Sequence, residues 1–225
     1  MKSMKRKTFL VALHARSFDQ CMVEAGRILI SGGAHGLLVV NNGFHVAAMP
    51  QDAAPSLFDI ATAIKKKFPD YLVGINPLEM KHFDALFEFK KTPLDILWVD
   101  DGGLNEVGST INLNFKVSKE LEGFDFNKQQ YFGCIDFKYQ KRVIDLPGVA
   151  KFAAKRFGCV ITSGEATGQA PSLGKIQTIC GAVGGDAFVG IASGISVSNI
   201  EYYLPFVDVF IVGTSLLVNI NDPFI

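Results

Sequence analysis

Asp136 and Lys138 stand two residues apart at the end of an apolar run, QYFGCIDFK, over residues 130–138. Side chains at positions i and i+2 of a strand point to the same side, so this spacing predicts that the carboxylate and the ammonium share one environment. A carboxylate there can move a proton, and an amine can stabilise an anion or form a Schiff base. The alternative is a structural ion pair that closes the end of the sheet.

Polar side chains also follow the other apolar runs of the chain. They are His14, Asn41, Asn42, Asn76, Asp100, Asp101, Thr162, Ser163, Ser193, Thr214 and Ser215. Some polarity is expected wherever a strand ends at water, but a set that contains both Asp and Lys suits acid–base chemistry. Only one of Asp100 and Asp101 can point inward, where it would bind a metal or a sugar hydroxyl, and the other suits a turn or cap. His14 suits an acid, a base or a ligand, or else a hydrogen-bonded core histidine.

Two glycine turns end two further apolar runs: Gly194-Ile195-Ser196, directly after Ser193, and Gly213-Thr214-Ser215. Glycine lets a ligand approach the backbone closely, and N–H and hydroxyl donors in such turns gather around anions. Ser196 or Ser198 is expected to cap a helix over VSNIEYYL, whose dipole would favour an anion. The pair of turns predicts a phosphate site, and the alternative is two ordinary strand-to-helix turns.

A long loop of small residues, TSGEATGQAPSLGK, covers residues 162–175. Long polar loops are often functional, so Thr162, Glu165 and Thr167 are candidate contacts to a substrate. Lys175 or Glu165 is a candidate for closing over a ligand. The alternative is a flexible loop at the surface.

Short apolar runs alternate with helical patterns along the chain. The runs cover residues 8–14, 36–42, 71–76, 94–103, 130–138, 159–164, 187–194 and 207–215, and the helical pattern near 107–121 is weak. Strands that are apolar on both faces and separated by helices form parallel sheets, and eight of them predict a (β/α)8 TIM barrel, one domain over residues 1–225. No Gly-x-Gly-x-x-Gly follows the first run, which disfavours the runner-up, an open dinucleotide-binding sheet. The strands of a barrel end at one mouth, so the candidate residues should meet there.

Ten residues, LLVNINDPFI, follow Ser215. This length predicts a short or missing eighth helix and a partly open side of the barrel. Residues 216–225 would then cover the gap or meet another subunit of a homo-oligomer.

Composition disfavours several classes of protein and of site. The formal net charge is zero and no basic stretch mixes with aromatics, so a nucleic-acid binder is not expected, and no apolar stretch is long enough to span a membrane. Four cysteines without metal-ligand spacing favour buried thiols in a reducing, cytoplasmic compartment. The basic start resembles a secretory signal, but its apolar run is short and a first strand is preferred. No organic cofactor motif is evident, and a divalent metal is compatible but unsupported.

Several of these stretches together resemble the BtpA family. ASGISVSNIEYYLPFVDVFIVGTS is similar to that family's Gly-x-x-x-x-Asn and Asp-x-x-x-Val-Gly-Thr-Ser pattern, and VITSGEATGQAP to its Thr-Gly-x-x-Thr-Gly segment. GLLVVNNG, VGINPL and IDFKYQ are weaker matches, and Asn41 stands where the family has Glu. The strong similarity covers about residues 155–216. The resemblance implies a phosphate-binding TIM barrel among the ribulose-phosphate-binding barrels and no particular reaction.

Two functions are compatible with this sequence. The first is an enzyme acting on a small phosphorylated metabolite by isomerase, epimerase, lyase or transferase chemistry. In it Asp136 would be the acid or base, Lys138 the electrophilic partner, and Asn76 and Asp100 would orient hydroxyls. The second is a non-catalytic accessory or assembly factor on an enzyme-like barrel, with residues 216–225 as its partner surface.

Overall fold

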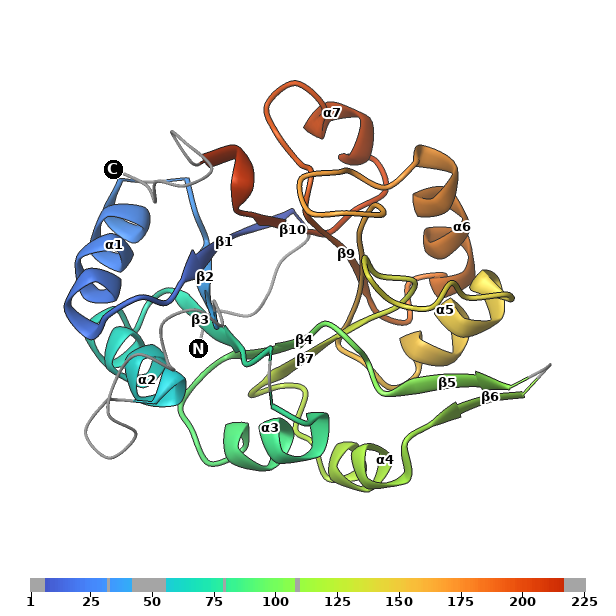
Figure 1. Ribbon diagram of the computed structural model, residues 1–225, viewed down its shortest axis with the longest axis horizontal. Helices are drawn as coiled ribbons and strands as arrows, with labels where there is room; N and C mark the ends of the chain where they lie inside the picture. The colour runs from blue at the N-terminus through green and yellow to red at the C-terminus, as the bar shows by residue number, and fades with distance from the viewer. Residues whose placement is uncertain (1–6, 32, 42–55, 79, 108–109, 217–225) are drawn as a thin grey trace.

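Eight of the apolar runs form parallel strands that close into a barrel (Figure 1). The structure, a computed structural model, describes residues 7–31, 33–41, 56–78, 80–107 and 110–216. The barrel closes because β1 pairs on one side with β2, Leu10 opposite Gly36, and on the other with β10, Thr8 opposite Val209. The barrel strands are β1 (Thr8–His14), β2 (Gly36–Val40), β3 (Leu72–Asn76), β4 (Ile96–Val99), β7 (Gln130–Cys134), β8 (Cys159–Thr162), β9 (Phe188–Ala192) and β10 (Val209–Val212). The predicted TIM barrel is confirmed.

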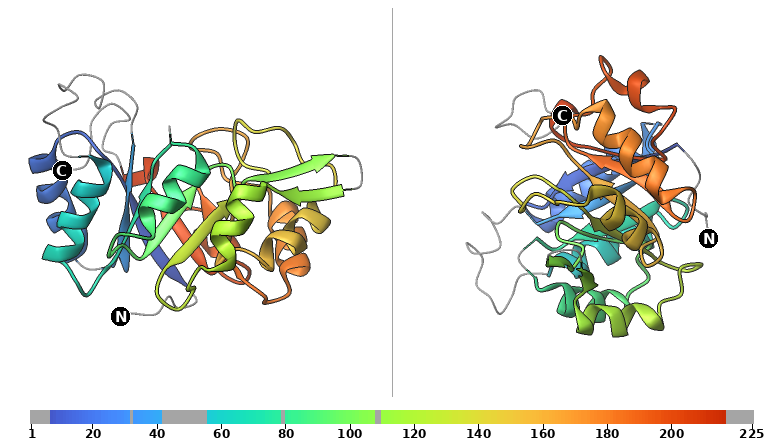
Figure 2. Two further views of the ribbon diagram at one scale, coloured as in Figure 1. Left: turned by 90° about the horizontal axis from the view of Figure 1, so that it is seen from below. Right: turned by 90° about the vertical axis from the view of Figure 1, so that its right-hand side faces the viewer.

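Helices between the strands cover the outside of the barrel (Figures 1 and 2). They are α1 (Phe18–Ile30), α2 (Leu57–Lys67), α3 (His82–Phe89), α4 (Phe115–Glu122), α5 (Leu146–Ala154), α6 (Leu173–Val183) and α7 (Ile200–Tyr203). Local chemistry sets several of their starts: Ser56 and Asp59 form a reciprocal capping box at α2, and Ser172 caps α6.

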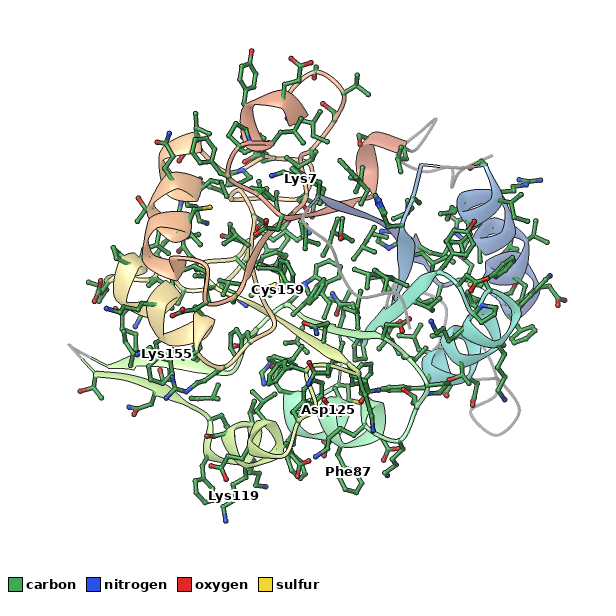
Figure 3. All side chains as sticks on the ribbon, turned by 180° about the vertical axis from the view of Figure 1, so that it is seen from behind. Lys7, Phe87, Lys119, Asp125, Lys155 and Cys159 are labelled. Carbon is green, nitrogen blue, oxygen red and sulfur yellow. The ribbon has the colours of Figure 1, made fainter. Side chains whose placement is uncertain are left out.

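The alternation of side chains along each strand divides the core into two parts. In β2, Leu38 and Val40 lie inside the barrel, whereas Leu37 and Val39 pack toward the helices. Figure 3 shows side chains filling the barrel with Cys159 near its centre, while Phe87 and Lys119 lie on the periphery. The barrel is therefore a packed core, and a ligand can be admitted only at an end.

A β-hairpin follows β4 where the sequence pattern gave a weak helix. Its strands are β5 (Leu104–Val107) and β6 (Thr110–Leu113), which pair antiparallel and project from the barrel (Figure 2). Leu104, Ile111 and Leu113 pack against the core. In β6, Ile111 and Leu113 alternate with the polar Thr110 and Asn112, and this period of two suits a strand. The helical prediction is wrong for residue 107 and for residues 110–113, and α4 begins only at Phe115.

After β10 the described chain makes only a 3-10 turn, η1 (Thr214–Leu216), so no α-helix follows β10 in residues 213–216. A groove of about 720 Å³ lies beside it, between α1 and strands β1 and β10, and Ile28 and Leu216 are among its lining residues. This agrees with the predicted short or missing eighth helix. Residues 217–225, which were expected to cover the gap, lie outside the described residues.

The apolar run near the N-terminus forms strand β1, as expected. Cys21, Cys134, Cys159 and Cys180 are all free thiols, and the first three are buried. No helix within the described ranges is long and apolar enough to cross a membrane.

Candidate active site at the barrel mouth

The floor of the barrel mouth, the end at which the strands finish, is aromatic and buried. Trp98 Nε1 donates a hydrogen bond to Cys134 Sγ at 3.1 Å, and the Phe137 ring meets the Trp98 ring edge to face at 6.3 Å between centroids. All three side chains are buried. Burial raises the pKa of the Cys134 thiol well above its usual value, and the nearby Asp100 carboxylate adds to the shift. Cys134 is therefore a neutral part of the floor and not a nucleophile.

Asp100 is the member of the Asp100–Asp101 pair that points into the mouth. Its Oδ1 accepts a hydrogen bond from Asn76 Nδ2 at 2.9 Å, which joins the ends of β3 and β4. Asp101 is exposed and accepts the backbone N–H of Gly103 at 2.8 Å, the turn role expected for the outward residue. Burial raises the pKa of the Asp100 carboxyl, although the hydrogen bond from Asn76 and the charge of Lys138 act in the opposite direction.

Lys138 reaches across the mouth to two hydroxyl groups. Its Nζ lies 3.1 Å from Ser193 Oγ and 3.2 Å from Thr167 Oγ1, and 5.5 Å from the centroid of the Phe137 ring. Among the described residues, no Asp or Glu forms an ion pair with this ammonium. The Lys138 charge is therefore held by neutral groups.

His14, at the end of β1, lies near enough to Lys138 for the ammonium to affect its titration. Burial lowers the pKa of the His14 imidazole, and the charges of Lys138 and Arg16 lower it further. The imidazole is consequently neutral at pH 7 and able to accept a proton. Lys138 thus lies close to both a neutral imidazole and a carboxyl group whose pKa is raised.

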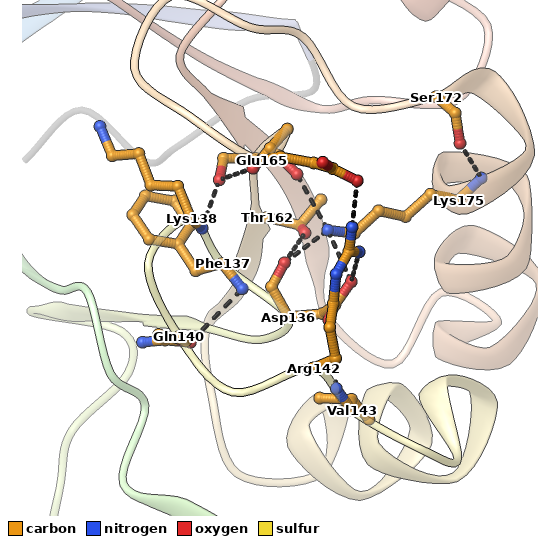
Figure 4. A network of polar contacts seen from close by, with 12 residues as sticks. Asp136, Phe137, Lys138, Gln140, Arg142, Val143, Thr162, Glu165, Ser172 and Lys175 are labelled. Atoms are coloured by element: carbon orange, nitrogen blue, oxygen red, sulfur yellow. Dashed lines mark hydrogen bonds and ion pairs between the residues drawn. The ribbon is translucent and has the colours of Figure 1, made fainter.

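Asp136 points away from Lys138. Its carboxylate lies 2.8 Å from Lys175 Nζ and 3.3 Å from Arg142 Nη1, and it accepts the N–H of Val143 at 3.2 Å. Figure 4 shows Lys138 extending to the opposite side from this cluster. The predicted Asp136–Lys138 pair does not form, because the strand ends at Cys134 and Asp136 has φ +42°, so the i, i+2 alternation no longer applies.

Burial would raise the pKa of the Asp136 carboxyl, but the hydrogen bonds from Lys175 and Val143 and the charges of Lys175 and Arg142 bring it below its usual value. Lys175 Nζ also donates to the backbone carbonyls of Ser163, at 2.9 Å, and of Asp136. The ammonium therefore ties the turn after β7 to the turn after β8. Lys175 is turned to this cluster and does not close over the mouth.

The three candidate substrate contacts of the loop after β8 lie in two places. One is in the mouth, and two are beside Asp136 and Arg142. Thr162 is fully buried and donates to the carbonyl of Asp136 at 3.3 Å. Glu165 is exposed and pairs with Arg142. Thr167 reaches the mouth, where its hydroxyl also meets Tyr139 OH at 3.2 Å. Of the three predicted loop contacts, the structure brings only Thr167 to Lys138.

A pocket of about 300 Å³ lies between the two glycine turns. It is lined by Gly168, Gly194, Ile195, Ser196, Asn199, Ile211, Val212, Gly213 and Ser215. The Ser215 hydroxyl donates to the Ile195 carbonyl at 2.8 Å and so ties one turn to the other. Thr214 belongs to η1 beside this pocket. The two turns expected to act together are therefore neighbours in the structure.

Asn199 holds the first turn in shape. Its Oδ1 accepts the N–H of Ser196 at 2.9 Å, and its Nδ2 donates to the carbonyl of Gly194 at 2.8 Å. Asn199 is also the N-cap residue of α7, so the expected capping by Ser196 or Ser198 is wrong. Since α7 has only four residues, the helix dipole expected at this site has little basis.

Three residues other than glycine have positive φ angles around the mouth: Asp136 at +42°, Tyr139 at +64° and Ser193 at +88°. Such conformations cost about 1–3 kcal/mol each and cluster at functional sites. Two of the three, Asp136 and Ser193, were candidates from the sequence. Their backbone strain supports a functional role for this end of the barrel.

Asn41 contributes to the frame of the mouth through its backbone. Its N–H donates to the carbonyl of Asn76 at 3.0 Å, and the preceding Val40 lies inside the barrel together with Leu38. Asn42, also named from the sequence, lies outside the described residues.

No group of three His, Cys, Asp or Glu side chains in the described part of the chain is placed to hold a metal.

The sequence pattern did not single out three residues that shape the site. Tyr139 bonds Thr167, Gln140 donates to the carbonyl of Asp100, and Asn199 braces the Gly194 turn. For Asn199 a signal existed, because Gly194 and Asn199 have the Gly-x-x-x-x-Asn spacing. The other two lie in an irregular turn, where spacing does not determine direction.

No protein-family model and no curated protein matches the chain. Its fold is similar to that of several solved structures. It aligns with the native KDPGal structure at 10% identity and TM-score 0.66, covering 99% of this chain and 89% of that one. It aligns with phosphoribosyl anthranilate isomerase from Thermus thermophilus at 14% identity and TM-score 0.57, covering 94% and 90%.

Thiamine phosphate pyrophosphorylase from Pyrococcus furiosus is a further match, at 14% identity and TM-score 0.57, covering 95% of this chain and 88% of that one. The last two proteins are, by name, enzymes of phosphorylated small molecules. At these identities the similarity shows the fold alone. The chain shares the architecture of these TIM barrels over nearly its full length.

Proposed function

We propose that this protein is an enzyme acting on a small phosphorylated metabolite at the barrel mouth. The single observation that carries the proposal is the position of Lys138 Nζ, 3.1 Å from the hydroxyl of Ser193. Ser193 directly precedes Gly194, which lines the pocket between the glycine turns. An ammonium without a carboxylate partner in the described chain thus adjoins a pocket suited to an anion.

In this proposal the phosphate occupies the pocket between the turns. The backbone turns at Gly194 and Gly213 let it approach closely, and the hydroxyl of Ser196 adds a contact. The hydroxyl of Ser215 adds a second contact when it leaves the Ile195 carbonyl. The pocket volume of about 300 Å³ leaves room for a phosphate group and the first atoms of its substituent. The rest of the substrate extends over the aromatic floor toward Asp100 and His14.

The proposed proton-transfer groups are His14 and Asp100. Their pKa values are shifted toward each other, His14 downward and Asp100 upward, which suits a base and an acid working near neutral pH. Asn76 holds the Asp100 carboxyl in place. Asp136 becomes a positioning residue that fixes the turn carrying Lys138. Isomerase, epimerase and lyase reactions need no more than such a set of groups.

The proposal is tested by thermal stability against a panel of inorganic phosphate, sulfate, pentose phosphates, phosphoribosyl compounds and nucleotides. A ligand at a hundredfold excess over its dissociation constant stabilises the fold by about 2.7 kcal/mol. We expect one phosphorylated class to raise the melting temperature. In Gly213→Asp the carboxylate would enter the pocket, where the added Cβ lies 3.4 Å from Ala12 Cβ and is tolerated. This variant should lose the response.

The matched control is Gly123→Asp, at an exposed glycine after α4 with open space around its position. It should keep the response. A panel with no effect on a well-folded protein contradicts the proposal, and so does a response that Gly213→Asp retains.

One observation favours the second candidate, a non-catalytic assembly factor. The groove of about 720 Å³ beside α1 is lined mainly by apolar residues, with Glu24 and Arg27 at its wall. A partner would then cover this groove, and removing residues 217–225 should change the oligomeric state measured by light scattering. An unchanged state with a folded barrel counts against this candidate.

A further inference from the structure

We propose that Lys138 forms a Schiff base with the carbonyl carbon of a short phosphorylated aldehyde or ketone. The inference rests on the proposed function and deepens it, because it names the electrophile in the substrate. The inference requires the amine of Lys138 to act as a nucleophile, whereas binding an anion would require only its positive charge.

The contacts of Lys138 differ from those of two other half-buried lysines, Lys175 and Lys65. Lys175 and Lys65 lie 2.8 and 2.7 Å from the carboxylates of Asp136 and Asp95 and are therefore each engaged in an ion pair. Lys138 instead meets Ser193 Oγ, Thr167 Oγ1 and the face of the Phe137 ring. An amine that is not one half of an ion pair can turn toward a carbonyl without breaking a charged contact.

The backbone of Lys138 is fixed, while its side chain remains partly exposed at the mouth. The N–H of Lys138 donates to Ser163 Oγ at 2.8 Å, and the preceding Phe137 is buried in the barrel core. The amine therefore starts from a defined point and reaches into the mouth. A nucleophile needs a backbone that is held in place and a reactive atom that the substrate can reach.

Two proton-transfer groups lie within electrostatic reach of the amine, and imine formation requires both roles. The Lys138 ammonium first gives a proton to solvent. The neutral amine then attacks the carbonyl carbon, forming a C–N bond, while the electron pair of the C=O π bond moves to oxygen. His14 takes a proton from the nitrogen and passes it to that oxygen, which becomes a hydroxyl. Asp100 donates a second proton to the hydroxyl, the C–O bond breaks, water leaves, and the C=N bond forms. The protonated nitrogen returns its proton to the Asp100 carboxylate. Amine and carbonyl thus give an imine and one water molecule.

The neighbouring pocket determines which carbonyl compounds fit. Ser193 Oγ, 3.1 Å from the amine, belongs to the residue before Gly194 of the pocket. A phosphate seated there leaves only a few atoms between phosphorus and the carbon that Lys138 attacks. Short aldose and ketose phosphates meet this requirement, and long nucleotides do not.

The test is hydride trapping. The full chain is incubated separately with glyceraldehyde 3-phosphate, dihydroxyacetone phosphate and ribose 5-phosphate in the presence of sodium cyanoborohydride, and its intact mass is measured. An imine reduced by hydride adds the mass of the compound less one oxygen atom. We expect one such adduct per chain with at least one compound, and peptide mapping should place it on Lys138. Glycerol 3-phosphate, which has no carbonyl, should give none.

Two variants make the result specific. Lys138→Arg keeps the positive charge but cannot form an imine, so it should lose the adduct while phosphate still raises its melting temperature. Lys155→Arg changes an exposed lysine after α5 and should trap as the unaltered protein does. Adducts that Lys138→Arg retains, or that spread over surface lysines, overturn the inference.

The outcome also separates this inference from the proposed function. If no compound gives an adduct but phosphorylated ligands still stabilise the protein, Lys138 is an anion ligand and the Schiff-base inference is wrong. If neither an adduct nor stabilisation is found, the proposed function fails with it.

Discussion

The carboxylate of Asp136 lies 2.8 Å from the ammonium of Lys175, and both side chains are nearly excluded from solvent. The same ammonium reaches the carbonyl of Ser163, so a single side chain joins the turns after β7 and β8. Lys138 and Thr167, which meet in the mouth, follow these two turns. The buried pair thus serves the mouth indirectly, by fixing the backbone from which Lys138 extends.

Lys175→Met should destabilise the fold strongly. It leaves the buried Asp136 carboxylate with only the exposed Arg142 as a charged partner, and removing one half of a buried pair costs about 3 kcal/mol. The free energy of unfolding from urea titration measures the loss. Lys155→Met, at an exposed site, should change it by less than about 0.5 kcal/mol. Equal effects of the two substitutions would contradict the structural role of Lys175.

His14 should make the stability depend on pH near neutrality. The folded pKa of His14 is lowered from 6.5, so between the two values the unfolded chain binds more protons. Stability therefore rises with pH in this window, and it falls as pH drops below about 6.5, by at most about 1.4 kcal/mol per pH unit. Urea unfolding at pH 5.5 and 7.5 should show a smaller difference for His14→Gln. The same difference in both proteins would refute this assignment.

Gly194→Ala should unfold the turn against which the loop after β8 packs. Gly194 has φ +73°, and an added Cβ would lie 2.0 Å from Ala170 N and 2.2 Å from Gln169 C. Backbone strain and a clash with backbone atoms together should cost about 3 kcal/mol or more. Gly168→Ala is the matched control, because it has φ +80° and open space, so strain alone should cost about 1–2 kcal/mol. Equal losses in urea unfolding would show that the tight contact at Gly194 is unimportant.

Ser193 combines backbone strain with a contact to Lys138, and two substitutions separate these roles. Ser193→Gly and Ser193→Ala both remove the 3.1 Å hydrogen bond, but only glycine adopts φ +88° without strain. We expect the glycine variant to be more stable than the alanine variant by about 1 kcal/mol. Both should lower the yield of the Lys138 hydride adduct. An adduct yield unchanged in both variants would mean that Ser193 does not position the amine.

The sequence by itself determined the barrel and the end at which its chemistry lies. Runs that are apolar on both faces are typical of a parallel sheet covered by helices, and eight of them alternating with helical segments favour a closed barrel. Strand alternation also determined that one of Asp100 and Asp101 faces inward. The sequence also predicted that the turns at Gly194 and Gly213 are neighbours, because they follow the last two strands of the barrel.

The tertiary structure decided which charges meet. Asp136 turns to Lys175 because its φ of +42° ends the strand alternation, and a left-handed residue cannot be deduced from a spacing of two. The partners of Lys138, Thr167 and Ser193, come from loops 29 and 55 residues away in the chain. The brace by Asn199 and the shortness of α7 likewise depend on how the turn packs. Sequence patterns predict helices and strands because these depend on interactions between residues a few positions apart. The site depends on contacts between loops that are distant in the chain.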